Sequence, residues 1–170
     1  MTKWARAAIV STLALVAGAI AARPAGAQAL GYGIAGPGGY SGFFGSSALP
    51  MLHAAGGGEF LAGRRVGVGG EFGLLANSDG GVFVTSANGV FHFAPSVATP
   101  IKSRISPFAS GGYTRITGGE GGFDAWNLGA GADLWLKPRV GVRLEFRDHI
   151  RPDSRGGVQY WAFRAGVVFR

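Results

Sequence analysis

The feature of this chain that most constrains its fold is an alternation of apolar and polar side chains with a period of two. In Val158 to Arg170, the odd positions from Trp161 onward are all apolar, whereas the even positions combine Arg164 with small residues. The segments Arg139 to Asp148 and Asp124 to Leu136 repeat the pattern. Successive side chains of a β-strand point to opposite faces, so this period predicts three amphipathic strands of about ten residues each.

Five earlier segments show a weaker form of the same alternation. They are Leu30 to Gly36, Leu52 to Leu61, Arg65 to Leu74, Val82 to Phe93 and Ile105 to Thr117. In the last of them the pattern leaves the two faces undecided, because Phe108 and Tyr113 differ in parity. With the three C-terminal segments they predict an all-β fold of eight strands.

The connections between these segments alternate in character, which indicates the topology. Short or proline-marked links alternate with links rich in Gly, Ser and Asp, the first of which we place at Pro37 to Pro50. This alternation of two kinds of link favours an eight-stranded antiparallel up-and-down barrel, with both termini at the end that has the short turns.

The N-terminus has the pattern of a cleavable signal peptide. Lys3 and Arg6 precede an uncharged stretch from Ala7 to Ala22, and small residues then lead up to Gln28. A membrane-anchoring helix is the alternative, but this stretch is shorter than the roughly 20 residues that a spanning helix needs. We therefore expect residues 1–27 to be a signal peptide and residues 28–170 to be the barrel.

The composition of the polar face decides which side of the barrel meets lipid. Glycine, which accounts for 32 of the 170 residues, is frequent on the polar parity, where a solvated face would carry more Lys, Glu, Thr and Gln. A crowded lumen would demand such small residues. Aromatic residues near strand ends are typical of the girdles of membrane barrels. These candidates are Trp126, Trp135, Tyr160, Trp161 and Phe169. The pattern favours a transmembrane barrel over a secreted, lipocalin-like one.

The C-terminal stretches resemble a known family. Asn127 to Gly131, Arg143 to Asp148 and Phe163 to Arg170 are similar to segments of the small outer-membrane β-barrel proteins of Gram-negative bacteria, the OmpA/OmpX-like barrels. The resemblance implies export through the periplasm to the bacterial outer membrane, with outer-membrane lipid and the barrel insertion machinery as partners. Members usually end in an aromatic residue, whereas here Phe169 is followed by Arg170. We expect a monomer.

The parity of the strands divides the side chains between the lumen and the lipid. Buried charges are stable when they are paired and hydrogen-bonded, and an eight-stranded barrel is narrow enough for them to meet. We expect a lumen filled with paired charges, and the alternative is a gate that exchanges partners and opens a narrow, low-conductance pore. The predicted lumen network is Glu59, Glu71, Asp133, Arg143, Glu145, Arg147 and Arg164, and the predicted lipid-facing set is Leu128, Leu134, Leu144, Phe146, Phe163 and Phe169.

A catalytic interpretation has less support. Some outer-membrane barrels modify lipid A, and His149, Asp148 and Ser154 could supply a base, a carboxylate and a hydroxyl for acyl transfer. Three such residues in a polar loop arise easily by chance, so we expect a structural or surface-interaction protein and not an enzyme. Three scattered histidines and no cysteine match no metal-ligand spacing, and we expect neither a metal nor a cofactor. The arginines do not cluster, which disfavours nucleic-acid binding.

Overall fold

A computed structural model describes residues 28–42, 49–62, 65–78, 80–93, 105–119, 121–151 and 157–170. The eight strands are β1 (Gln28–Gly42), β2 (Leu49–Ala62), β3 (Val66–Asn77), β4 (Gly80–His92), β5 (Ile105–Gly118), β6 (Gly121–Lys137), β7 (Val140–Arg151) and β8 (Val158–Phe169). The predicted signal peptide lies outside the described residues. In the part of the chain that the structure covers, no helix is long and apolar enough to cross a membrane.

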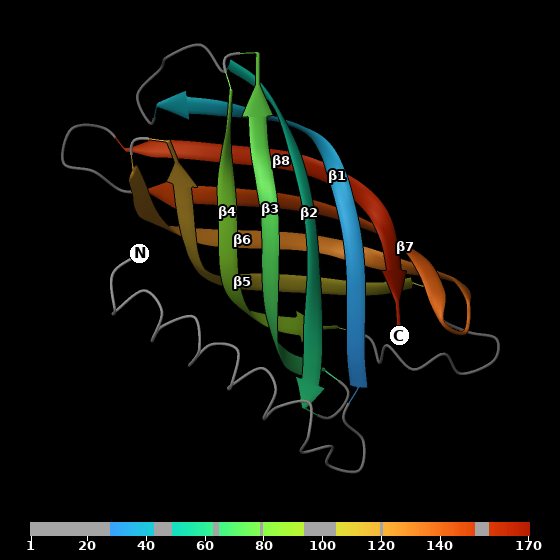
Figure 1. Cartoon of the computed structure of the whole chain (residues 1–170). Coiled ribbons are helices and arrows are strands. Elements are labelled where there is room, and N and C mark those ends of the chain that lie inside the picture. The colour runs from blue at the N-terminus through green and yellow to red at the C-terminus, as the bar shows by residue number, and fades with distance from the viewer. Residues whose placement is uncertain are drawn as a thin grey trace.

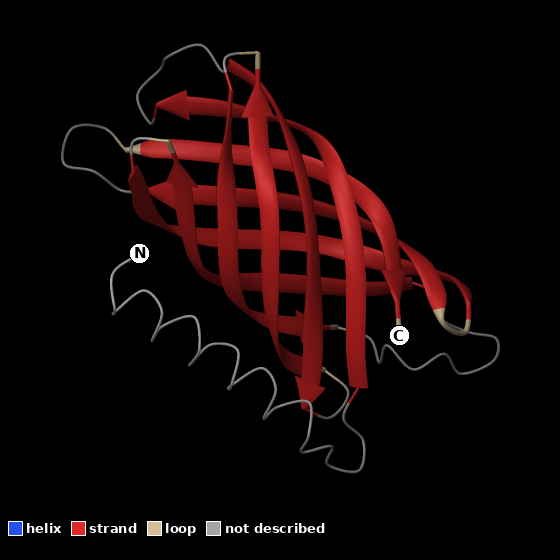
Figure 2. Cartoon of the chain, in the orientation of Figure 1, coloured by secondary structure: helices blue, strands red, loops and turns tan. Residues whose placement is uncertain are grey.

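The strands close into a single antiparallel barrel (Figures 1 and 2). Each strand pairs with the next, and β1 pairs with β8 in a register that aligns Gly31 with Phe169. The predicted fold class is therefore confirmed. We call the end of the barrel that contains Gln28 and Phe169 the terminal end, and the opposite end the loop end.

One predicted loop is wrong. The segment Pro37 to Pro50 is strand at both ends, because β1 continues to Gly42 and β2 begins at Leu49. Its glycines suggested a loop, but here they allow close packing of strands. A Cβ added to Gly38, or to Gly36 just before this segment, would collide with the backbone of β8, so a larger residue would separate the two strands.

The inner and outer faces follow the alternation in the sequence. In β5, Phe108 points inward and is 2% exposed, whereas Tyr113 lies on the outer face and is 45% exposed, which resolves the ambiguity of that strand. The prediction that Trp135 and Tyr160 belong to an aromatic girdle is wrong. Both have the parity of the polar face and point inward, and Trp135 is only 4% exposed.

Two apolar clusters lie inside the barrel, one toward each end. The cluster at the terminal end consists of Leu30, Tyr32, Ile34, Leu61, Trp135 and Val168. The cluster at the loop end has Leu75, Val84 and Ile116 at its centre. At the terminal end, the Arg170 guanidinium lies 3.9 Å from the centroid of the Trp135 ring and its Nε donates to the Pro138 carbonyl. A polar layer fills the lumen between the two clusters.

Candidate functional site

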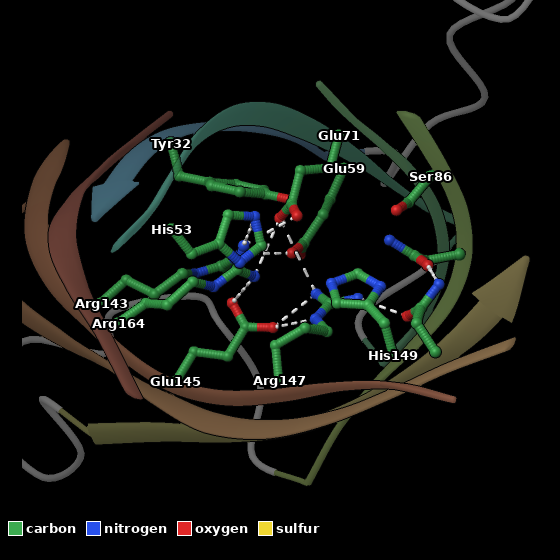
Figure 3. Close-up of polar contacts among 12 residues, drawn as sticks. Tyr32, His53, Glu59, Glu71, Ser86, Arg143, Glu145, Arg147, His149 and Arg164 are labelled. Atoms are coloured by element: carbon green, nitrogen blue, oxygen red, sulfur yellow. Dashed lines mark hydrogen bonds and ion pairs between the residues drawn. The ribbon is translucent and has the colours of Figure 1, made fainter. Parts of the chain in front are cut away.

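The polar layer contains all seven of the charged residues that parity placed inside the barrel. Figure 3 labels all of them except Asp133. None of them is more than 6% exposed. They are Glu59 on β2, Glu71 on β3, Asp133 on β6, Arg143, Glu145 and Arg147 on β7, and Arg164 on β8. The network therefore joins five of the eight strands across the interior.

Arg143 is at the centre of the part of the network nearer the terminal end. Its Nε and Nη2 donate to the two carboxylate oxygens of Asp133 at 2.7 and 2.9 Å, and its Nη1 donates to Glu59 at 2.5 Å. The guanidinium also lies 4.4 Å from the ring centroids of both Tyr32 and Phe108. Bidentate pairing and two aromatic faces together replace the water that this cation loses on burial.

His92 is the second nitrogen partner of Glu59. Its Nε2 lies 3.1 Å from Glu59 Oε2, and its Nδ1 lies 3.3 Å from the Ser106 hydroxyl. An ionised carboxylate can only accept hydrogen bonds, so Nε2 is the donor in this pair. Arg143 donates two hydrogen bonds to Asp133 but only one to Glu59, and His92 supplies a second hydrogen bond to Glu59.

The part of the network nearer the loop end is a ring of two arginines and two glutamates. Arg164 donates to both oxygens of Glu71 at 2.8 and 3.0 Å, and its Nη2 lies 3.0 Å from Glu145. Arg147 donates from Nε to Glu145 at 2.7 Å, and its Nη2 is 3.9 Å from Glu71. Each carboxylate thus lies within ion-pair distance of both arginines, and the ring is balanced in charge.

Tyr32 on β1 connects the two parts. Its ring packs against the Arg143 guanidinium, while its hydroxyl donates to Glu71 Oε2 at 3.1 Å. Parity alone did not identify Tyr32, because β1 has little alternation. Two further polar partners lie on the polar parity but were not part of the predicted network: Asn127 accepts from Arg147 Nη1 at 2.6 Å, and the ring of His53 contacts Arg164 at 3.3 Å.

Inward-facing glycines provide the room that these side chains occupy. A Cβ placed on Gly129 would lie 2.8 Å from the Ser110 hydroxyl and 2.9 Å from both Arg147 Nε and Glu145 Oε1. A Cβ on Gly131 would lie 2.8 Å from the Phe108 ring. The glycine content of the polar parity therefore follows from the bulk of the network.

The residues predicted to face lipid lie on the outer surface of the barrel. Their exposed fractions are 60% for Leu128, 37% for Leu134, 55% for Leu144, 37% for Phe146, 61% for Phe163 and 52% for Phe169. They belong to β6, β7 and β8 and have the opposite parity to the network residues of these strands.

The geometry does not support the acyl-transfer alternative. His149 points into the lumen, where its Nδ1 lies 3.2 Å from the Thr114 hydroxyl. Asp148 points the other way and accepts from Gln159 at 2.6 Å. Neighbouring residues of one strand face opposite sides, so this pair cannot act as base and orienting carboxylate. Ser154 lies outside the described residues. Within the described ranges, no group of three or more His, Cys, Asp or Glu could hold a metal ion.

Comparison with known proteins agrees with this architecture. The family model described as the outer membrane protein β-barrel domain matches residues 11–170. The chain belongs to this family. A search of curated proteins finds no match. The family places the barrel in the bacterial outer membrane.

Solved structures share the fold at low sequence identity. Neisserial surface protein A superposes with a TM-score of 0.61 at 13% identity, covering 85% of this chain and 99% of that one. The N-terminal β-barrel domain of Pseudomonas aeruginosa OprF gives a TM-score of 0.57 at 14% identity, covering 83% and 96%. OprG from Pseudomonas aeruginosa gives 0.51 at 10% identity, covering 85% and 95%.

Proposed function

We propose that this protein is a structural component of the outer membrane whose lumen is permanently sealed by its buried ion pairs. The observation that carries the proposal is the state of the three lumen arginines. Arg143, Arg147 and Arg164 are each 2% exposed or less, and each is paired with carboxylates from other strands or from its own. An ion crossing the barrel would have to break several charge-assisted hydrogen bonds in a medium of low dielectric constant.

The closed topology supports the remaining parts of this proposal. Since every strand is paired on both sides, the barrel has no free strand edge to join to a second copy, and we propose that it acts as a monomer. We also propose that the barrel insertion machinery places it among outer-membrane lipids, and that its loop end takes part in surface contacts.

Planar-bilayer recording of the refolded protein tests the seal. We expect no discrete conductance steps from the wild type. We expect steps from the double variant Glu71→Ala/Arg164→Ala, because it removes both members of one ion pair and leaves a gap without a stranded charge. An outer-face variant, Leu144→Ala, serves as the control and should be silent. Discrete steps in the wild type would contradict the proposal.

A gated pore is the second candidate, and one distance favours it. Arg147 Nη2 is bonded to Glu145 but also lies 3.9 Å from Glu71, so a small rotation would exchange its partner. Such exchange would produce brief openings of low conductance. In that case the wild type would show conductance steps that Arg147→Ala abolishes. The sealed barrel instead predicts that the wild type shows no steps.

A further inference from the structure

A cavity of about 380 Å³ lies inside the barrel at the loop end, separate from the charge network. Its walls come from the loop-end portions of β1, β2, β3, β4 and β8, which Figure 1 shows around that end of the barrel. The lining residues are Tyr40, Leu49, Met51, Leu75, Asn77, Gly80, Gly81, Val82 and Tyr160. Its volume falls within the range of roughly 300–1,000 Å³ that is usual for small-molecule sites.

The lining is apolar and uncharged, in contrast to the layer beneath it. Met51, Val82 and Tyr160 pack on the loop-end apolar cluster, so this cluster forms the floor of the cavity. None of the described residues that line it is Asp, Glu, Lys, Arg or His. Polar groups are restricted to the phenols of Tyr40 and Tyr160 and to the Asn77 amide. This combination of apolar walls and a few polar groups is typical of sites for small organic molecules.

Aromatic rings form one side of the cavity. The rings of Tyr40 and Tyr160 lie 4.9 Å apart between centroids, and Tyr160 also stacks on Phe123 at 6.1 Å. The Arg151 guanidinium covers Phe123 at 4.8 Å from the ring centroid. These contacts hold the tyrosines in place, so the cavity has a preformed aromatic wall for another ring to contact.

We propose that this loop-end cavity binds a small uncharged aromatic alcohol. The apolar walls would take the ring, and the hydroxyl of Tyr40 or Tyr160 would bond the hydroxyl of the ligand. An anion would have to enter an apolar cavity whose described lining residues include no cation, which is costly. Because the floor is closed, the molecule binds and leaves by the same opening and does not cross the barrel. The proposal is independent of the structural role proposed above.

The position of Met51 provides a direct assay. The chain contains two methionines, Met1 and Met51, so methyl-¹³C methionine labelling places a single probe in the barrel. The experiment titrates 4-methylphenol into the folded full barrel in lipid nanodiscs and follows the Met51 methyl resonance. We expect a saturable shift. Benzoate at the same concentrations should leave the resonance in place.

Two tryptophan substitutions test whether the shift comes from the cavity. Leu49 lines the cavity at its rim and is 50% exposed, so Leu49→Trp should fill the opening while the barrel still folds. Leu52 is 54% exposed on the outer face, and Leu52→Trp is the matched control.

We expect the apparent Kd to rise at least tenfold in Leu49→Trp and to change less than twofold in Leu52→Trp. Heat-shifted gel mobility verifies that each variant is folded. A linear shift that never saturates, an equal shift in all three proteins, or an equal response to benzoate would overturn the proposal.

Discussion

Glu71 and Arg164 lie 93 positions apart in the chain, yet they form a bidentate ion pair in the middle of the lumen, at 2.8 and 3.0 Å. Arg164 is on the last strand and Glu71 on the third, so closure of the barrel brings them together. Both side chains are withdrawn from water, and each therefore depends on the other for stability.

Removal of Arg143 should strongly destabilise the barrel. Arg143→Ala leaves Asp133 and Glu59 buried beside each other without their shared cation, and we expect a loss of about 3–5 kcal/mol in the free energy of unfolding. Urea unfolding in lipid vesicles, followed by tryptophan fluorescence, measures this loss. Arg115→Ala is the control, since its ion pair with Asp124 is exposed on the outer face, and the unfolding midpoint should hardly move. Equal midpoints for both variants would contradict the expectation.

Two substitutions at Tyr32 should separate its hydrogen bond from its ring contact. Tyr32→Phe removes the donor to Glu71 but keeps the ring against Arg143, and we expect a loss of about 1–3 kcal/mol. Tyr32→Leu removes both interactions and should cost more, because the contact between cation and ring is also lost. The same unfolding assay compares them. If the two variants were equally stable, the ring contact with Arg143 would contribute nothing.

A pair of glycine substitutions should reveal how tightly the lumen is packed. Gly129→Ala places a methyl group within 2.8–2.9 Å of Ser110, Arg147 and Glu145, and the overpacking should cost about 1–3 kcal/mol. Gly33→Ala is the matched change on the outer face, where an added Cβ meets nothing within 4 Å, and it should stay within about 0.5 kcal/mol of the wild type. Unfolding in vesicles distinguishes the two. If Gly129→Ala left the free energy of unfolding unchanged, the surrounding side chains would be able to move aside at little cost.

A charge on the outer face should lower the free energy of unfolding more when it lies nearer the middle of the bilayer. Leu144 lies near the middle of the membrane face of β7, so Leu144→Arg should lower the free energy of unfolding in bilayers by about 2–4 kcal/mol. Leu52→Arg, close to the end of β2, should cost only about 0–1 kcal/mol. The loss of the compact unboiled band on gels, together with vesicle unfolding, tests this order. Equal costs at the two positions would be inconsistent with a bilayer around the barrel.

The sequence predicted the side of the barrel for the seven charged residues of the network because side chains alternate between the two faces of a strand. Glu71, Asp133 and Arg143 could all be placed in this way before any contact was known. Pairing partners could not be predicted, since they depend on the stagger between strands, which brings Arg143 to Glu59 and Arg164 to Glu71. The glycine-rich β1 was the least predictable strand, and it supplies Tyr32.

Aromatic residues were harder to assign than charged ones. Trp135 has the parity of the lumen, but its position near a strand end also suits a lipid interface, and the prediction followed the position instead of the parity. Its contact with Arg170 depends on residues at the far end of the chain, which local sequence does not reveal.

The pairing of β1 with β8 has a consequence for how the protein is made. The eighth strand of the barrel supplies both the hydrogen-bond partner for the first and the bidentate arginine partner of Glu71 on the third. Without β8, the barrel would have two open edges, and Glu71 would lose its bidentate partner and keep only Arg147 at 3.9 Å. A bilayer interior does not tolerate open strand edges. A chain that stops before Val158 should therefore fail to form a barrel in the membrane, just as a much shorter chain would.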